Sequence, residues 1–267
     1  MIVVELRKLL RRPRTWVSIG LLALLPTIVA IFLSTSGVAP RPGTGPAFLS
    51  AVLDNGALFP AAALAIVLPL FLPVAVAVVA GDAVAGEAQA GTLRYLLVRP
   101  VSRTRLLVAK LVSVVAFTML AVVVVSVVAY VVGTNLFGSS PLPSTSGTTL
   151  TTTEATIRTC LAVAYVGWSM LGVAAIALFL STVVDSPLAA SLGAVAVLVT
   201  SGVLVGLDAA SSVQPYLPTR YWLAFVDLFR DPVLTRDLVR GTALQAVYVG
   251  VFLTGAWANL MTKDVTS

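Results

Sequence analysis

Long apolar stretches separated by shorter polar segments dominate the pattern along the chain. A helix needs about 20 apolar residues to cross the hydrocarbon core of a bilayer. Six stretches come near or exceed that length, at approximately 16–33, 57–80, 106–133, 157–180, 188–207 and 242–261. Uninterrupted apolar runs suit helices, because a strand of a membrane barrel would alternate in polarity. The pattern therefore predicts an all-α membrane protein with six transmembrane helices in a single domain over residues 1–267.

The first 14 residues carry a two-sided pattern. At about 100° per residue, their apolar side chains fall in one arc and their charged side chains share the opposite half. Such a basic segment lies along a membrane surface, with Pro13 marking the break before the first span. We therefore expect residues 1–14 to form an interfacial helix in contact with membrane lipids. The alternative is a signal peptide ending near Ala39, but residues 16–33 are long for its apolar core.

Composition agrees with a membrane location and indicates an orientation. The chain is 58% hydrophobic and only 10% charged, which leaves too little polar surface for a water-soluble globule. The net charge of +6 arises from basic residues that flank the spans, so we expect no nucleic-acid partner. Eleven Lys and Arg residues belong to one side of the six spans and six to the other, which predicts that both termini are cytoplasmic. The Arg-, Ala-, Val- and Leu-rich composition favours a bacterial plasma membrane.

The segments on the outer side differ in kind. Residues 34–56 and 134–155 are rich in Ser, Thr, Gly and Pro, which is typical of irregular loops. Residues 208–240 instead combine Trp222, Phe225 and other aromatic side chains with balanced charges. We expect short helices there, packed at the outer interface. A structural plug and a lid over an exit path are both open interpretations.

The stretch between spans two and three, residues 81–105, contains the most informative pattern. Thr92 can cap a short helix whose leucines fall on one face, Pro100 can end it, and Ser102 can cap the third span. This predicts a stiff apolar knob at the membrane surface, beside Glu87 and several arginines. A solvated basic loop is one interpretation, and a grip for a soluble motor protein is the other.

The same stretch resembles the signature of permeases of the ABC type 2 exporter family. That signature is an acidic residue, then Gly-Thr-Leu, a Leu pair and Pro-Val-Ser-Arg, with a lysine shortly after. The corresponding residues here are Glu87, Gly91, Thr92, Leu93, Leu96, Leu97, Pro100, Val101, Ser102, Arg103 and Lys110. The similarity extends in outline to the amphipathic start with Glu5 and Lys8, the six spans and the enlarged last outer segment.

The resemblance implies specific partners. In this family the inner loop forms a cytoplasmic coupling helix between spans 2 and 3, which sits in a groove of an ABC ATP-binding subunit. Two copies of that subunit and a second permease, identical or related, would complete the exporter, with the substrate route between the permeases. The chain itself has no Gly-x-x-x-x-Gly-Lys-[Ser/Thr] motif, so we expect no enzyme activity and no cofactor in it. ATP and Mg²⁺ would bind in the partner subunit.

Other chemistry finds little support in the sequence. Histidine is absent and Cys160 is the single cysteine, which leaves no histidine- or cysteine-based metal site and no histidine-dependent catalysis. The acidic residues map to span edges, loops or, for Glu5, the surface helix, so none is expected near mid-membrane. Ion-coupled carriers usually place ionisable groups there. A lipid-modifying enzyme lacks clustered carboxylates for a metal.

Two pairs of residues are candidates for a pathway or a dimer interface. Pro69 and Pro73 should kink span two, either to fit its neighbours or to line a route. Gly202 and Gly206 permit close helix approach, either inside the chain or to a second permease. The sequence thus predicts the permease subunit of an ATP-binding-cassette exporter that performs efflux, and the alternative is a secondary active transporter of a small molecule.

Overall fold

The structure is a computed structural model that describes residues 1–36, 48–49, 51–53, 55–92, 102–138, 142–143 and 149–262. Its α-helices are α1 (Ile2–Arg11), α2 (Pro13–Ser36), α3 (Phe59–Val67), α4 (Phe71–Gln89), α6 (Arg103–Phe137), α7 (Thr152–Val183), α8 (Pro187–Val205) and α9 (Arg236–Thr262). Short 3₁₀ helices are η1 (Ala51–Leu53), η2 (Gly56–Leu58), η3 (Asp208–Ala210), η4 (Gln214–Tyr216) and η5 (Trp222–Phe229). The two-residue strands β1 (Leu142–Pro143) and β2 (Thr149–Leu150) pair antiparallel, with Leu142 opposite Leu150.

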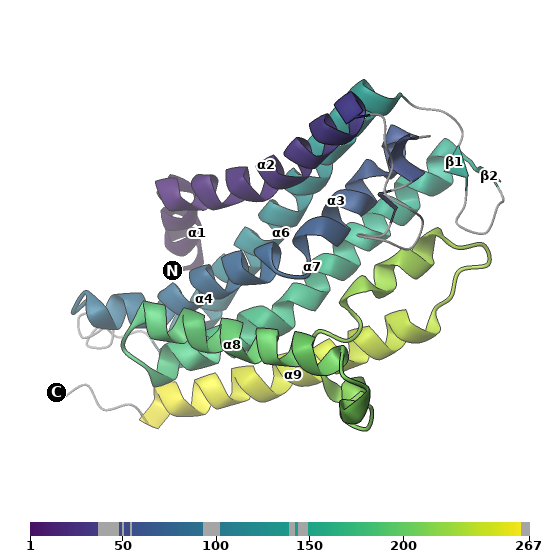
Figure 1. Ribbon diagram of the computed structural model, residues 1–267. Helices are drawn as coiled ribbons and strands as arrows, with labels where there is room; N and C mark the ends of the chain where they lie inside the picture. Colours follow the sequence, from purple (N-terminus) through teal and green to yellow (C-terminus); the bar gives the residue numbers. More distant parts are fainter. Residues whose placement is uncertain are drawn as a thin grey trace.

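Six of the helices are long and apolar enough to cross a membrane: α2, α4, α6, α7, α8 and α9. The predicted fold class is therefore confirmed, and the chain is an all-α, multi-pass membrane protein. The start of α1 and the end of α9 lie at the same end of the bundle, as an even number of spans requires (Figure 1). We call this end the proximal end and the opposite one the distal end.

The second predicted span, 57–80, is divided in the structure. Helix α3 ends at Val67, a turn follows over residues 68–70, and α4 begins at Phe71 and runs on to Gln89. Pro69 lies in the turn and Pro73 in the first turn of α4, where proline's missing N–H leaves no helical hydrogen bond unmade. The predicted kink is confirmed, and the helix after it extends well beyond residue 80.

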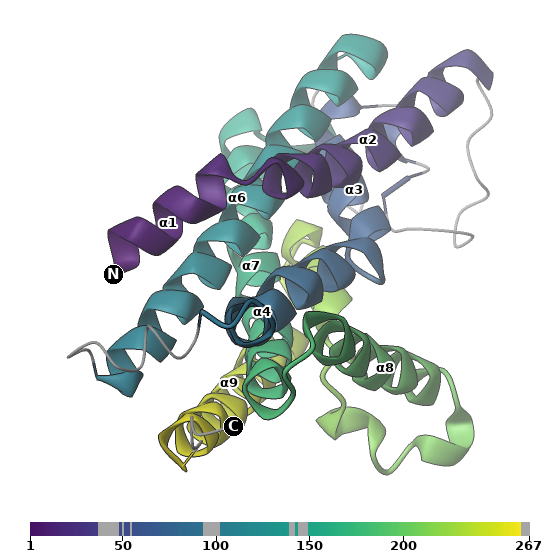
Figure 2. The ribbon, with the colours of Figure 1, turned by 90° about the vertical axis from the view of Figure 1, so that its left-hand side faces the viewer.

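Helix α7 forms the centre of the bundle and is the most buried of the six long helices. Helices α4, α6, α8 and α9 all pack against it. Viewed from the proximal end, α2 lies on one side of α7 and α8 on the opposite side (Figure 2). Helix α2 packs on α6, whereas α8 packs mainly on α4. Every long helix thus contacts α7 directly or through one neighbour.

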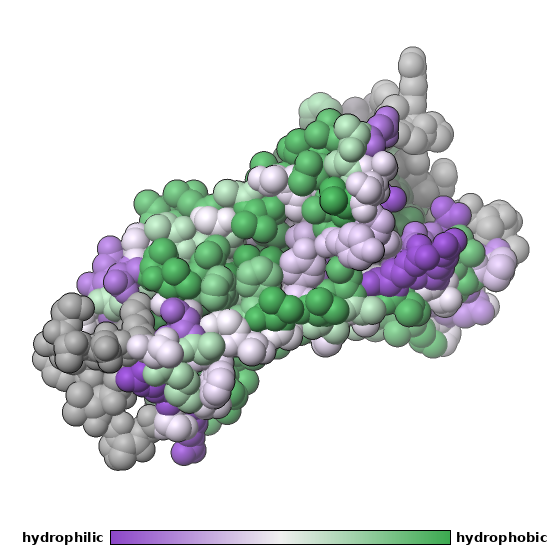
Figure 3. Space-filling view, turned by 90° about the horizontal axis from the view of Figure 1, so that it is seen from below, coloured by the Kyte–Doolittle hydropathy of each residue, from purple (hydrophilic) through white to green (hydrophobic). Residues whose placement is uncertain are grey.

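The outward surface of the bundle is apolar. Exposed large hydrophobic side chains recur on the peripheral helices, and examples are Leu21, Phe32, Val127, Leu188 and Val247. On the face seen in Figure 3, hydrophobic residues predominate over the middle and the most hydrophilic residues lie toward the two ends. This distribution matches a bilayer whose hydrocarbon core contacts the middle of the bundle.

The segment that the sequence predicts to be an interfacial helix contains the helix α1, which ends at Arg11. Arg12 is extended, with φ −79° and ψ 120°, and Pro13 is the first residue of α2. Proline fits this first position because its fixed φ suits a helix and no N–H is needed there. The break predicted at Pro13 is confirmed, and α1 leaves α2 at a sharp angle (Figure 1).

Short helices form between residues 208 and 229, as the aromatic pattern predicts, whereas residues 236–240 already belong to α9. The short helices are 3₁₀ helices, and η5 buries Phe225 and Phe229 against α7. Side chains of the long helices donate to backbone carbonyls of this segment. Tyr165 Oη donates to Tyr221 O at 2.8 Å, and Gln245 Nε2 donates to Pro218 O at 2.8 Å. The segment is thereby fixed on the distal part of the bundle.

Helix α6 and η2, the single 3₁₀ turn before α3, approach each other closely at two glycines. A Cβ added at Gly133 would clash with the Gly56 carbonyl oxygen, and one added at Gly56 would clash with the Gly133 carbonyl. By contrast, a Cβ added at Gly250 on α9 would meet nothing within 4 Å. The approach of α6 to this turn therefore depends on the absence of side chains.

Replacing Gly133 with Ala is expected to destabilise the fold by about 1–3 kcal/mol, because the backbone atoms it meets cannot rotate away. Gly250→Ala is the matched control and should leave the melting temperature unchanged or higher, since alanine favours a helix. Thermal unfolding of the purified variants in detergent compares the two. Equal melting temperatures would contradict the close approach.

Candidate functional site at the proximal end

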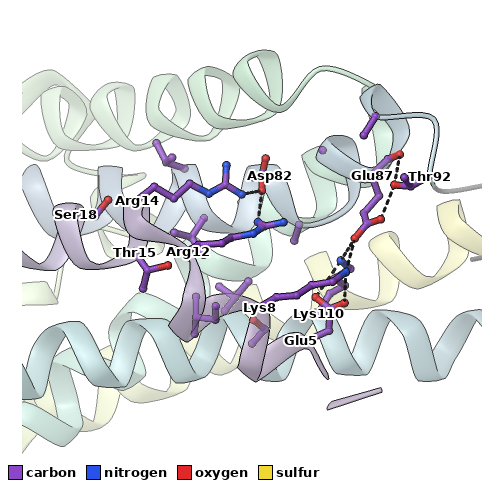
Figure 4. A pocket seen from close by; sticks show the side chains of 18 residues that line it. Glu5, Lys8, Arg12, Arg14, Thr15, Ser18, Asp82, Glu87, Thr92 and Lys110 are labelled. Atoms are coloured by element: carbon purple, nitrogen blue, oxygen red, sulfur yellow. Dashed lines mark hydrogen bonds and ion pairs between the residues drawn. The ribbon is translucent and has the colours of Figure 1, made fainter. Parts of the chain in front are cut away.

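Four charged side chains from three helices meet at the proximal end. Lys110 Nζ on α6 lies 3.1 Å from Glu5 Oε2 on α1 and 2.9 Å from Glu87 Oε1 on α4. Lys8 Nζ on α1 lies 3.3 Å from Glu5 Oε1 and 3.2 Å from Glu87 Oε1. Each lysine thus contacts both carboxylates, and we call this arrangement the four-charge cluster (Figure 4).

Local sequence explains how these side chains converge. Glu5 and Lys8 are three residues apart on α1, so they share a face of that helix. Leu9 is buried, which turns that face toward α6, the helix on which α1 packs. Glu87 occupies the last turn of α4, and Lys110 lies two turns inside α6. Three separate helices therefore meet through charges that balance one another.

The two lysines differ in burial. The Lys110 side chain is only 6% exposed, whereas that of Lys8 is 42% exposed. A buried ammonium is costly unless its lost hydration is replaced, and the two carboxylates supply that replacement for Lys110. For Lys8, burial alone would lower the pKa, but the charges and hydrogen bonds of Glu5 and Glu87 outweigh it, and the pKa is raised from its ordinary value. Lys8 therefore stays protonated at neutral pH.

A second ion-pair group lies on the same side of α4. Arg12 Nη1 is 3.0 Å from Asp82 Oδ2, and Arg14 Nη2 contacts the same oxygen. Between this group and the four-charge cluster is a cavity of about 480 Å³. Figure 4 shows both groups along its wall. Its other lining residues include Thr15, Ser18, Val78, Val79, Thr92, Ser113 and Val114.

The end of α4 is fixed by a glycine turn. Gly91 has φ +67°, in the left-handed region that favours glycine, and its N–H donates to Ala88 O at 3.0 Å. Thr92 N donates to Glu87 O at 3.0 Å, which completes a Schellman motif. Thr92 Oγ1 also donates to Glu87 Oε2 at 2.7 Å. The predicted site residues Glu87, Gly91 and Thr92 thus form one rigid corner.

The start of α6 is fixed as well. The Ser102 hydroxyl accepts from Arg105 N at 3.3 Å, so the predicted cap of the third span is confirmed. Arg103 Nη1 donates to Leu260 O and to Met261 O, both at 2.8 Å, at the carboxyl end of α9. Leu93, Leu96, Leu97, Pro100 and Val101 lie outside the described residues. The coupling helix itself therefore stays a prediction, and its two flanking residues are anchored.

The candidate pathway residues gather at a groove. Pro69, Pro73 and Gly202 line a space of about 520 Å³ between α4, α8 and η5, whereas Gly206 caps the end of α8 and does not line it. A Cβ added at Gly202 would meet nothing within 4 Å, and one at Gly206 would meet only Val203 O of its own helix. Within the described part of the chain, neither glycine therefore makes a close contact with another helix.

Comparison with known proteins identifies a family. Residues 20–264 match the family described as "Protein of unknown function (DUF2705)". The chain belongs to the DUF2705 family. The match extends from α2 to α9 and leaves Glu5 and Lys8, which precede it, outside the matched range. No curated protein matches the chain.

This DUF2705 protein also contains a contact that the sequence does not reveal. Ser181 on α7 is fully buried, and its hydroxyl accepts from Val84 N at 3.0 Å and Ala85 N at 2.9 Å. It donates to Gly81 O at 2.6 Å. A hydroxyl inserted between backbone groups of a neighbouring helix is a recognised cause of helix bending. It ties α7 to α4 between Asp82 and Glu87.

Removing the buried lysine should destabilise this DUF2705 protein more than removing the exposed one. Lys110→Met leaves Glu5 and Glu87 without their buried partner, and we expect a loss of about 3–5 kcal/mol. Lys8→Met removes the same charge from a side chain that is 42% exposed, so we expect at most about 1 kcal/mol. Chemical denaturation in detergent measures both.

A double-mutant cycle with Glu87→Gln tests the pairing directly. If Lys110 and Glu87 interact as described, the loss in the double variant is smaller than the sum of the two single losses. Strict additivity, or equal losses for Lys110→Met and Lys8→Met, would contradict the cluster.

Proposed function

We propose that the chain is the transmembrane permease subunit of an ATP-binding-cassette exporter, which moves substrate outward with ATP hydrolysed by a separate subunit. The observation that carries the proposal is the anchoring of both flanks of residues 93–101. Glu87 ties one flank to α1 and α6, and Arg103 ties the other to α9. Anchored flanks suit the transfer of force. If residues 93–101 were displaced, α1, α4, α6 and α9 would move together.

The wider contacts of these helices support the same mechanism. Ser181 joins α7 to α4, and Asn259 Nδ2 on α9 donates to Thr182 O on α7 at 2.7 Å. A push on residues 93–101 would therefore reach the central helix through both α4 and α9. An apolar surface formed by Leu93, Leu96 and Leu97 would supply binding energy to an ATP-binding subunit, and the charges around it would fix the register.

The proposal includes a cell location and partners. Both termini would face the cytoplasm of a bacterium, with the spans in the plasma membrane, since basic residues concentrate at the proximal end. Two ATP-binding subunits and a second permease would complete the exporter. ATP and Mg²⁺ would bind in the ATP-binding subunits, and no nucleic acid would take part.

A route for substrate would follow the groove between α4, α8 and η5. Its wall is mainly apolar, and Trp222 adds a buried indole N–H that has no hydrogen-bond partner within the described residues. An apolar or amphipathic compound with a hydrogen-bond acceptor would fit these groups. The open surroundings of Gly202 would let a second permease close the groove.

A secondary active transporter of a small molecule is the second candidate. The break over residues 68–70 favours it, because unwound backbone inside a span is typical of carrier binding sites. Co-purification separates the two candidates: an exporter retains a P-loop ATPase, and a carrier does not.

Changing Leu96 to Asp should detach the ATP-binding subunit, because a charge would replace an apolar anchor. The matched control is Leu207→Asp, a leucine that is about half exposed at the distal end. Pull-down from membranes and ATPase turnover in nanodiscs measure the effect. Unchanged co-purification and turnover in the Leu96 variant would defeat the coupling assignment.

Changing Gly202 to Leu should reduce transport without lowering stability. A Cβ added at Gly202 meets nothing within 4 Å and the position borders the groove, so the melting temperature should stay within a few degrees of the wild type. Transport in inside-out vesicles should fall, because the side chain would fill the groove or hinder a second permease. Full transport together with full stability would remove the groove from the proposed route.

A further inference from the structure

Two arginines share one carboxylate oxygen at the junction of α1 and α2. Arg12 Nη1 and Arg14 Nη2 both contact Asp82 Oδ2. One carboxylate carries a single negative charge, so the three groups together keep a net charge of +1. A guanidinium has five N–H donors in a planar fork, and the two side chains are 46% and 55% exposed. Donors therefore remain for an anion in the neighbouring cavity.

The cavity beside these arginines combines three kinds of wall. The arginines and the four-charge cluster are charged, Thr15, Ser18 and Ser113 carry hydroxyls, and Val78 and Val79 are apolar. The four-charge cluster contains two lysines and two carboxylates, so it is neutral overall. The surplus positive charge therefore lies at the arginines. An anion would therefore be drawn to the α1–α2 side of the cavity.

The cavity lies beside the junction of α1 and α2, a position that suits the interface of a bilayer. Helix α1 is amphipathic and precedes the first span, and α2 exposes Val17, Leu21 and Leu24 immediately after the cavity residues. Trp16 is half exposed and its Nε1 donates to Leu10 O at 2.8 Å. Tryptophan favours the headgroup level of a membrane. An anionic group in the cavity and an acyl chain along α2 would both find suited surroundings.

We propose that the cavity binds the headgroup phosphate of an anionic phospholipid, held by Arg12 and Arg14 in competition with Asp82. Guanidinium and phosphate form charge-assisted, frequently bidentate hydrogen bonds. The hydroxyls of Thr15 and Ser18 face the polar part of the headgroup, and the apolar walls accept the start of the acyl chains. This site goes beyond the proposed exporter function and does not depend on it.

Titration with a defined lipid tests the site. The full-length protein in detergent is titrated with phosphatidylglycerol or phosphatidylcholine, and bound lipid is counted by native mass spectrometry. Phosphatidylglycerol should bind preferentially, and Arg12→Gln/Arg14→Gln should weaken its binding about tenfold or more. The matched control Arg7→Gln/Arg11→Gln removes the same charge from exposed positions of α1 that do not line the cavity, and its affinity should stay within about twofold.

A second variant distinguishes loss of the site from loss of folding, because it should bind the lipid more tightly. Asp82→Asn removes the competing carboxylate, so phosphatidylglycerol should bind severalfold more tightly than to the wild type. Glu154→Gln, a carboxylate at the distal start of α7, is the control and should cause no change. Equal losses in the two arginine pairs, or unchanged or weaker binding to Asp82→Asn, would overturn the proposal.

Inorganic phosphate separates a lipid from a soluble ligand. If the site requires a lipid, an excess of phosphate leaves phosphatidylglycerol bound, because phosphate lacks the acyl chains that contact the apolar walls. Displacement of the lipid by millimolar phosphate would overturn the lipid assignment in favour of a soluble anion.

Discussion

The proximal end of the bundle depends on one buried ammonium between two carboxylates. The Lys110 side chain on α6 is only 6% exposed, and the Glu5 and Glu87 carboxylates replace the water that its ammonium loses on burial. These carboxylates belong to α1 and α4, so satisfying one lysine brings three helices to one point. Lipid-facing apolar surface cannot select such an arrangement, since helices gain little hydrophobic energy from one another inside a bilayer. Charge pairing therefore supplies the specificity that hydrophobicity lacks here.

Two features at this end follow from the same constraint. Lysines hold the Glu87 carboxylate in place, and Thr92 Oγ1 donates to that same carboxylate. The glycine turn at Gly91, which lies between these two residues, is therefore next to a fixed group. Because α6 starts beside α9, Arg103 can satisfy carbonyl oxygens that the end of α9 leaves unpaired. The bundle thus fixes Glu87 and Arg103, which flank residues 93–101 on either side.

The sequence predicts the parts of this fold that depend on local properties. Hydropathy over single stretches predicts the six long helices, and proline chemistry predicts the break near Pro69. The Ser102 cap depends only on residues next to it in the sequence. Contacts between distant residues are different. A charged face on α1 predicts exposure for Glu5, yet packing on α6 buries it against Lys110. Nothing local to Ser181 distinguishes it from other small polar residues in spans.

The distal end is held by a different chemistry, and this bears on whether residues 208–240 act as a lid. Arg158 Nη1 on α7 donates to Leu228 O and Arg230 O, at 3.1 and 2.8 Å. Tyr165, also on α7, donates to Tyr221 O, and η5 buries Phe225 completely. A lid would have to break these bonds together and expose the aromatic rings. These contacts therefore favour a segment that stays fixed on α7 over a hinged lid.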